Sequence, residues 1–171
     1  MASILLGHLD LGAMAETSLV MVPLSEAQMA VLAGGGALGT ALLGIAANSA
    51  LAATFGVEDG EQTEIAALQL ADVAGLTGLE TGTRIVVVAA VAARLVPDEA
   101  DNGLVIVDGL KPAQVQAFFT GPRDESVAQQ AQGLSLDEAW SLPAVQELLG
   151  RHPLAWHDST ELTGSAELLQ L

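Results

Sequence analysis

The sequence predicts a single compact α+β domain in which a small mixed sheet is packed by several short helices. Short apolar runs that are typical of strands occur along the chain, between segments with helical spacing. These strands and helices follow no regular βαβ period, which favours the α+β class over a doubly wound sheet. With 171 residues, 51% of them hydrophobic, the chain suits one domain with its own core.

No repeat and no long linker divides the chain. We expect the domain to cover residues 19–163. It would follow an N-terminal extension, residues 1–18, that could be disordered, and precede a C-terminal tail, residues 164–171. The first residues are partly apolar but lack a basic segment, so we do not expect a secretory signal.

The first two elements are a strand and a helix. The apolar run Leu19–Val22 predicts a strand that ends at Pro23. Ser25–Gln28 has the S-x-x-Q pattern of a capping box, which predicts the start of a helix. This helix would reach about Leu32, and Gly34 can end it.

Residues 27–57 carry no charge and support two interpretations. The segment is long enough to cross a membrane as one helix. However, the three consecutive glycines Gly34–Gly36 disfavour a continuous helix, and no Lys or Arg flanks the segment. We therefore favour a helix, a glycine-rich turn, an inner strand over residues 41–47, and a short helix capped by Asn48 or Ser49.

Residues 61–76 predict the longest helix. Its apolar face is predicted from the spacing of Ile65, Leu68, Val73 and Leu76. Asp72 would lie on the polar side of this helix.

An unbroken apolar run, IVVVAAVAA, lies between Arg84 and Arg94 and predicts a strand that is buried on both faces. The two arginines would mark its solvent-facing ends. The loop PDEADNG that follows is expected to be a solvated hairpin turn before a strand over residues 104–107. Residues 115–120 fit either a helix or a strand.

The last third of the chain predicts three short helices and a final strand. Ser135–Glu138 forms a second capping box. The other segments are helices over residues 124–132 and 143–149 and a strand over residues 154–157.

The composition is strongly acidic, with 5 Lys and Arg against 21 Asp and Glu and a net charge of −16. Proteins that neutralise nucleic-acid phosphates need the opposite balance, so we expect no nucleic-acid partner. The acidity fits either a property of the whole source proteome or attraction to a basic protein partner. The absence of cysteine excludes disulfides, thiol nucleophiles and cysteine-ligated metals.

Four segments of the chain can be compared with a known family: MVPLSEAQMAVLAGG, EDGEQTEIAALQLA, RIVVVAAV and HPLAWHDSTEL. Together they resemble an uncharacterised actinobacterial domain-of-unknown-function family of small acidic proteins. The resemblance covers about Leu19 to Leu162 and implies a shared architecture and a bacterial, cytoplasmic setting. It implies no activity and no catalytic residues.

Titratable and aromatic residues gather only near the C-terminus, at His152, Trp156, His157 and Asp158. The two histidines and the aspartate could bind a metal or serve a hydrolase. On a strand, however, His157 and Asp158 would point to opposite faces. We therefore favour a strand end with one surface histidine and one buried tryptophan, and no metal.

Arg123, in the segment GPRDES, is the remaining candidate for binding an anion or a partner. It could equally pair with Asp124 or Glu125 at the surface. The glycines at 34, 36 and 39 match a dinucleotide-binding pattern, but they follow a predicted helix and precede a strand, the reverse of the required order. We expect no cofactor.

The function we expect is a cytoplasmic protein-binding or regulatory module without catalytic activity, whose acidic surface meets a basic partner. Arg123, Trp156, His157 and Asp158 are the candidate binding residues. Two alternatives stay open: a hydrolase or metal-binding enzyme with its site near His152, His157 and Asp158, and a small membrane-inserted protein through residues 27–57.

Overall fold

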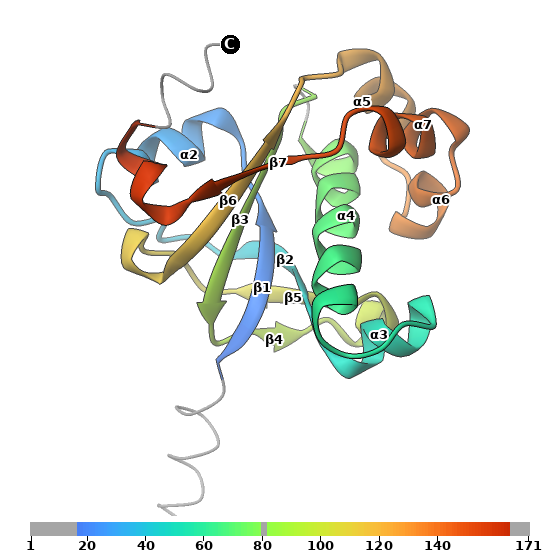
Figure 1. The fold of residues 1–171 in the computed structure, drawn as a ribbon, viewed down its shortest axis with the longest axis horizontal. Helices are drawn as coiled ribbons and strands as arrows, with labels where there is room; N and C mark the ends of the chain where they lie inside the picture. The colour runs from blue at the N-terminus through green and yellow to red at the C-terminus, as the bar shows by residue number, and fades with distance from the viewer. Residues whose placement is uncertain (1–16, 80–81, 165–171) are drawn as a thin grey trace, which may run out of the picture.

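The computed structural model describes residues 17–79 and 82–164 and shows a seven-stranded sheet with helices on both faces (Figure 1). The strand order is β4-β5-β2-β1-β3-β6-β7, and the predicted α+β class is confirmed. The sheet differs from the prediction in being fully antiparallel within the described residues, rather than small and mixed. The chain passes from β2 through helices to β3, and these two strands run in the same direction. They do not pair with one another, because β1 lies between them in the sheet.

The strands follow the apolar runs of the sequence. They are β1 (Ser18–Pro23), β2 (Leu42–Ala46), β3 (Arg84–Val91), β4 (Arg94–Leu95), β5 (Leu104–Val107), β6 (Val115–Gly121) and β7 (Ala155–Asp158). The ambiguous segment at residues 115–120 is a strand, because its alternation buries Phe118 completely.

Three of the helices, α2, α3 and α6, begin at predicted capping residues. The helices are α2 (Glu26–Ala33), α3 (Ser49–Phe55), α4 (Glu61–Gly78), α5 (Glu125–Ala131), α6 (Leu136–Trp140) and α7 (Pro143–Arg151), with short 3-10 helices η1 (Pro97–Asn102), η2 (Pro112–Gln114) and η3 (Ser159–Gly164). Ser25 and Ser135 form the two capping boxes, and Asn48 caps α3. The expected hairpin turn after β4 contains η1, which connects β4 to its antiparallel partner β5.

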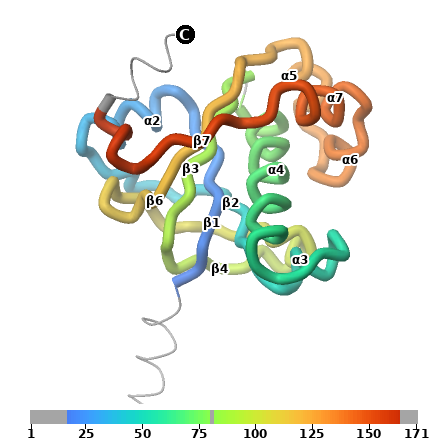
Figure 2. Tube along the Cα trace, viewed as in Figure 1, coloured from blue at the N-terminus to red at the C-terminus, as the bar shows by residue number. Residues whose placement is uncertain are grey.

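Each face of the sheet builds a separate core. On one face, Met21, Val86 and Val88 pack with α4 and the α5–α7 helices. On the other face, Val22 and Phe118 pack with α2 and η3. The traces in Figures 1 and 2 show α4 and α5–α7 on one side of the strands and α2 on the other.

The polarity predicted for α4 and β3 is partly wrong. Ile65, expected in the core, is 51% exposed, whereas Asp72 and Arg84, expected at the surface, are each 2% exposed. The reason is a buried ion pair in which Arg84 Nη2 lies 2.7 Å from Asp72 Oδ2, so each charge compensates the other inside the core. Arg94 is exposed as predicted and pairs with Asp108.

Residues 27–57 form all of α2 except its first residue, a turn, β2 and α3, and not one continuous helix. Among the described residues, no helix has both the length and the apolar character needed to cross a membrane. The predicted extension and tail fall mostly on residues 1–16 and 165–171, which lie outside the described residues; Ser18, assigned to the extension, begins β1.

Candidate functional site

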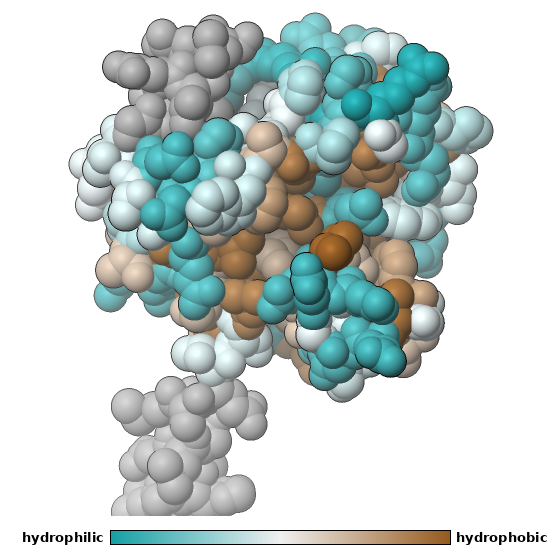
Figure 3. Space-filling view, viewed as in Figure 1, coloured by the Kyte–Doolittle hydropathy of each residue, from teal (hydrophilic) through white to brown (hydrophobic). Residues whose placement is uncertain are grey.

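An apolar groove lies between the first half of α4 and the strands β1, β3, β6 and β7. Its volume is about 420 Å³. Its apolar lining residues are Leu19, Met21, Ile65, Leu68, Val88, Ala117, Phe119 and Trp156. In the space-filling view of Figure 3, brown apolar surface occupies the middle of this face, beside teal hydrophilic residues.

The strand register places the groove residues on one face of the sheet. Val88 lies opposite Ala117, and Phe119 lies opposite Trp156, so their side chains project toward α4. A register shift between β3 and β6 pairs Ala89 with Val115 and leaves Gln116 as an extra residue. Such a bulge redirects a side chain, and Gln116 adds an amide to the groove.

Trp156 and Ile65 leave large apolar surfaces uncovered, with exposed fractions of 61% and 51%. The prediction of a buried tryptophan beside a surface histidine is therefore wrong. The side chains of β7 alternate between the two faces of the sheet, and the exposed position is that of Trp156 instead of His157. Trp156 points to the groove, which no other element of the described residues covers. The His157 side chain turns to the opposite face and is only 16% exposed.

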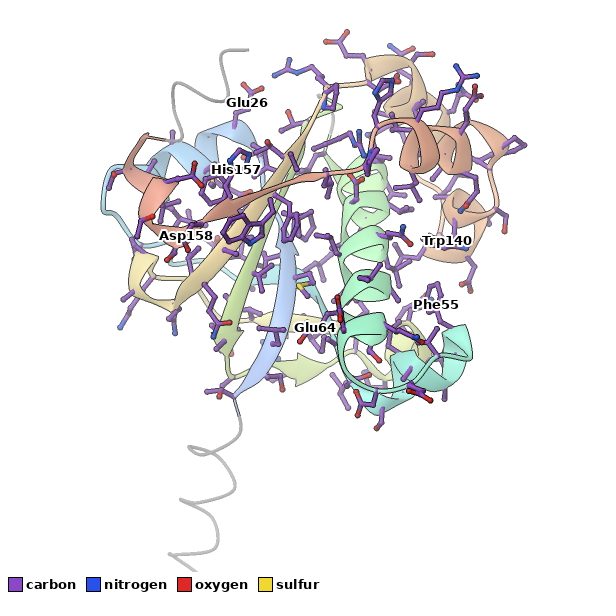
Figure 4. The ribbon with its side chains drawn as sticks, in the orientation of Figure 1. Glu26, Phe55, Glu64, Trp140, His157 and Asp158 are labelled. Carbon is purple, nitrogen blue, oxygen red and sulfur yellow. The ribbon has the colours of Figure 1, made fainter. Side chains whose placement is uncertain are left out.

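Two carboxylates stand at the rim of the groove. Glu61 and Glu64 belong to the first turn of α4 and are both exposed; Figure 4 labels Glu64 on this helix. Within the described part of the chain, neither glutamate takes part in an ion pair. Backbone N–H groups at a helix start favour negative charge, and the exposure of both carboxylates leaves them accessible to a cation.

The last residue of β7 is bonded within its own turn. Glu161 accepts a hydrogen bond from the Asp158 N–H at 2.7 Å, and Asp158 accepts one from the Thr160 hydroxyl at 2.7 Å. The Asp158 N–H is therefore not free to pair with another strand.

A second cavity, with a volume of about 750 Å³, lies on the other side of β7, next to α2. We call it the basic cavity, because its lining includes Arg84, Arg123 and His157. His157 stacks on Phe118 with ring centroids 4.9 Å apart, and its Nε2 shares a 2.9 Å hydrogen bond with Thr120 Oγ1.

Arg123 reaches across the basic cavity to Glu26 at the start of α2 and forms an ion pair with it. A second contact joins its Nη1 to Glu125 Oε1 at 3.9 Å, so one of the two predicted surface pairings is present. Figure 4 shows Glu26 and His157 near one another, on α2 and β7.

The predicted candidates are thus divided between two sites. Arg123 and His157 share the basic cavity, Trp156 lines the groove, and Asp158 is bonded at the edge of β7. His152 caps the end of α7 and lines neither cavity. No group of three or more His, Asp or Glu side chains that could hold a metal occurs in residues 17–79 and 82–164, so the structure does not assemble the proposed metal ligands.

Sequence reasoning missed the rim glutamates, the exposed face at Ile65 and the Asp72–Arg84 pair. For the pair, a signal was present: one aspartate interrupts an otherwise apolar helix, and one arginine adjoins the most apolar strand. Burial raises the pKa of Asp72, and hydrogen bonding and attraction to Arg84 act against this rise.

Fold and site together define an antiparallel α+β domain with an apolar, acid-rimmed groove on one face of its sheet and a basic cavity on the other. The chain belongs to a family of unknown function (DUF6912), whose model matches residues 19–164. The predicted membership of a domain-of-unknown-function family is confirmed. No curated protein matches the chain. No solved structure matches it either.

Proposed function

We propose that this protein is a cytoplasmic protein-binding module whose apolar groove takes a partner segment with apolar and basic side chains. The observation that carries the proposal is the exposure of Trp156 and Ile65 across the groove from one another, beside the exposed carboxylates of Glu61 and Glu64.

The apolar part of the groove would supply most of the affinity. Tryptophan is among the residues that most often dominate binding energy at protein interfaces. Trp156 extends the apolar floor formed by Phe119 and Val88, so a partner side chain placed there would be enclosed on several sides.

The acidic rim would select the partner by charge. Glu61 and Glu64 lie beside the apolar floor, and the whole chain carries a net charge of −16. A lysine or arginine next to the docked apolar side chain would meet these carboxylates, and the net charge would accelerate encounter with a basic partner.

The test is selection of binding peptides from a displayed random library, followed by affinity measurement on variants. We expect the enriched peptides to combine apolar residues with Lys or Arg. Trp156→Ala should weaken their binding roughly 30-fold, the effect of losing about 2 kcal/mol at an interface hot spot. The double variant Glu61→Gln/Glu64→Gln should also weaken binding, and the loss should shrink at high salt.

The matched control is Asp98→Asn/Asp101→Asn, which removes two exposed carboxylates from η1, away from the groove. Peptide affinity should be nearly unchanged in this control. Equal losses in both double variants would show that only net charge matters and would contradict a defined site. Enrichment of acidic or purely polar peptides would contradict the proposed partner chemistry.

A further inference from the structure

The basic cavity concentrates the few cationic groups of an acidic chain. The full sequence has 5 Lys and Arg and 3 His. Two of these arginines, Arg84 and Arg123, and one of these histidines, His157, line this one cavity. The chain has 21 Asp and Glu against 5 Lys and Arg, yet Glu26 is the only carboxylate among the described residues that line the cavity.

Only some of the hydrogen-bond donors of the Arg84 guanidinium have partners within the described residues. Its Nε and Nη2 donate to Asp72, but its Nη1 is buried without a hydrogen-bond acceptor among the described residues. This Nη1 packs against Gly121, a residue of the cavity wall, and lies 2.9 Å from where a Cβ at Gly121 would be. Buried polar groups are rarely left unpaired, and such exceptions often mark a position filled by a water or a bound ion.

Arg123 is held by a partner that a ligand can replace. Its side chain is 42% exposed, and that of Glu26 is 46% exposed. Exposed ion pairs of this kind contribute little stability, so an incoming anion can exchange with Glu26 at small cost. The planar guanidinium can then bind two oxygens of one oxyanion.

Thr120 and His157 add a hydroxyl group and an imidazole ring to the same wall. When His157 Nε2 donates to Thr120 Oγ1, the Thr120 hydroxyl proton is free to point into the cavity. In this tautomer the cavity offers a guanidinium and a hydroxyl donor at its surface, with the buried Nη1 of Arg84 beneath its wall.

We propose that the basic cavity is a binding site for an oxyanion, a phosphate or carboxylate group of a small molecule, with Arg123 as its principal ligand. In the free protein Arg123 forms an ion pair with Glu26, and the bound anion replaces Glu26 as the partner of Arg123. This site is separate from the groove and does not depend on the proposed partner.

The test is an NMR titration of the protein with inorganic phosphate and, separately, with acetate, at constant pH and with sodium chloride holding ionic strength constant. The ring signals of His157 should shift and saturate with one of the two anions, whereas those of His152 should not. The anion that saturates at the lower concentration distinguishes a phosphate from a carboxylate ligand.

Two variants with matched controls decide the role of Arg123. Arg123→Gln should weaken binding at least tenfold, whereas Arg94→Gln, which removes a more exposed arginine that is paired with Asp108, should leave it unchanged. Glu26→Gln should tighten binding severalfold by freeing Arg123. Glu147→Gln, which frees Arg151 on α7 in the same way, should not.

A tighter Glu26→Gln variant cannot result from misfolding, so it supports the site even if Arg123→Gln is unstable. Absence of saturation with both anions would overturn the proposal. So would equal changes at His152 and His157, or equal affinities for Glu26→Gln and Glu147→Gln.

Discussion

At the scale of single residues, the buried pair Asp72–Arg84 is the most consequential arrangement in the core. It joins the middle of α4 to the first residue of β3, with side chains that are 1% and 0% exposed. A buried charge is costly without its partner, whereas the pair as a whole adds little beyond what apolar residues would provide. The main effect of the pair is therefore to fix the position of α4 on the sheet, and its net contribution to stability is small.

We expect either single substitution at this pair to be strongly destabilising. Asp72→Asn or Arg84→Met should lower the free energy of unfolding by about 3 kcal/mol, because each leaves an uncompensated buried group. The double variant Asp72→Leu/Arg84→Met should be more stable than either single variant. Chemical denaturation of the three variants would measure this, and additive losses in the double variant would contradict it.

Single-residue burial was the least predictable property of this sequence. Helical spacing placed Ile65 in the core and Asp72 outside it, but the face of α4 that packs on the sheet is a different one from the face predicted. The same holds for Trp156, whose face depends on the register of β7 against β6. A shift of one residue reverses every side chain of a strand, and no local pattern fixes that register for a four-residue strand.

At the scale of elements, local chemistry predicted the boundaries well. The capping residues Ser25, Asn48 and Ser135 each begin a helix, because their side chains satisfy a backbone N–H of the first turn. The unbroken apolar run after Arg84 is a strand covered on both faces, as expected from its lack of alternation. No local sequence pattern predicted the bulge in β6 that places Gln116 in the groove.

The turn between η1 and β5 depends on Gly103, and it can be compared with a matched glycine. Gly103 has a φ of +70°, and a Cβ there would lie 2.7 Å from the Ala46 carbonyl oxygen. Gly133 has a similar φ of +75° with nothing within 4 Å. Gly133→Ala should cost about 1 kcal/mol for the left-handed backbone alone.

Gly103→Ala should cost at least about 2 kcal/mol more, because the backbone of β2 cannot easily move away from the new methyl group. Thermal and chemical unfolding of the two variants gives this difference directly. Equal losses would mean that the contact with Ala46 has no energetic consequence.

At the scale of the whole molecule, the sheet separates two surfaces of different chemistry. The groove combines apolar side chains with carboxylates on the α4 face, whereas the basic cavity lies on the α2 face. The α+β class followed from the irregular order of strands and helices. Neither surface could be predicted from the sequence, because both join β7 to residues far from it along the chain.

The most direct measurement is an NMR titration of the two tryptophan indole N–H signals with a peptide that the protein selects. Trp156 lies in the groove, whereas Trp140 packs edge-on against Phe55 at 5.3 Å, on the far side of α4 from the strands (Figure 4). Trp140 is therefore an internal control for general changes in the protein. Docking in the groove predicts that the Trp156 signal shifts and saturates with a peptide that carries apolar and basic residues, while the Trp140 signal stays in place. Saturable binding that leaves Trp156 unmoved, or that shifts only Trp140, would contradict the groove as the binding site.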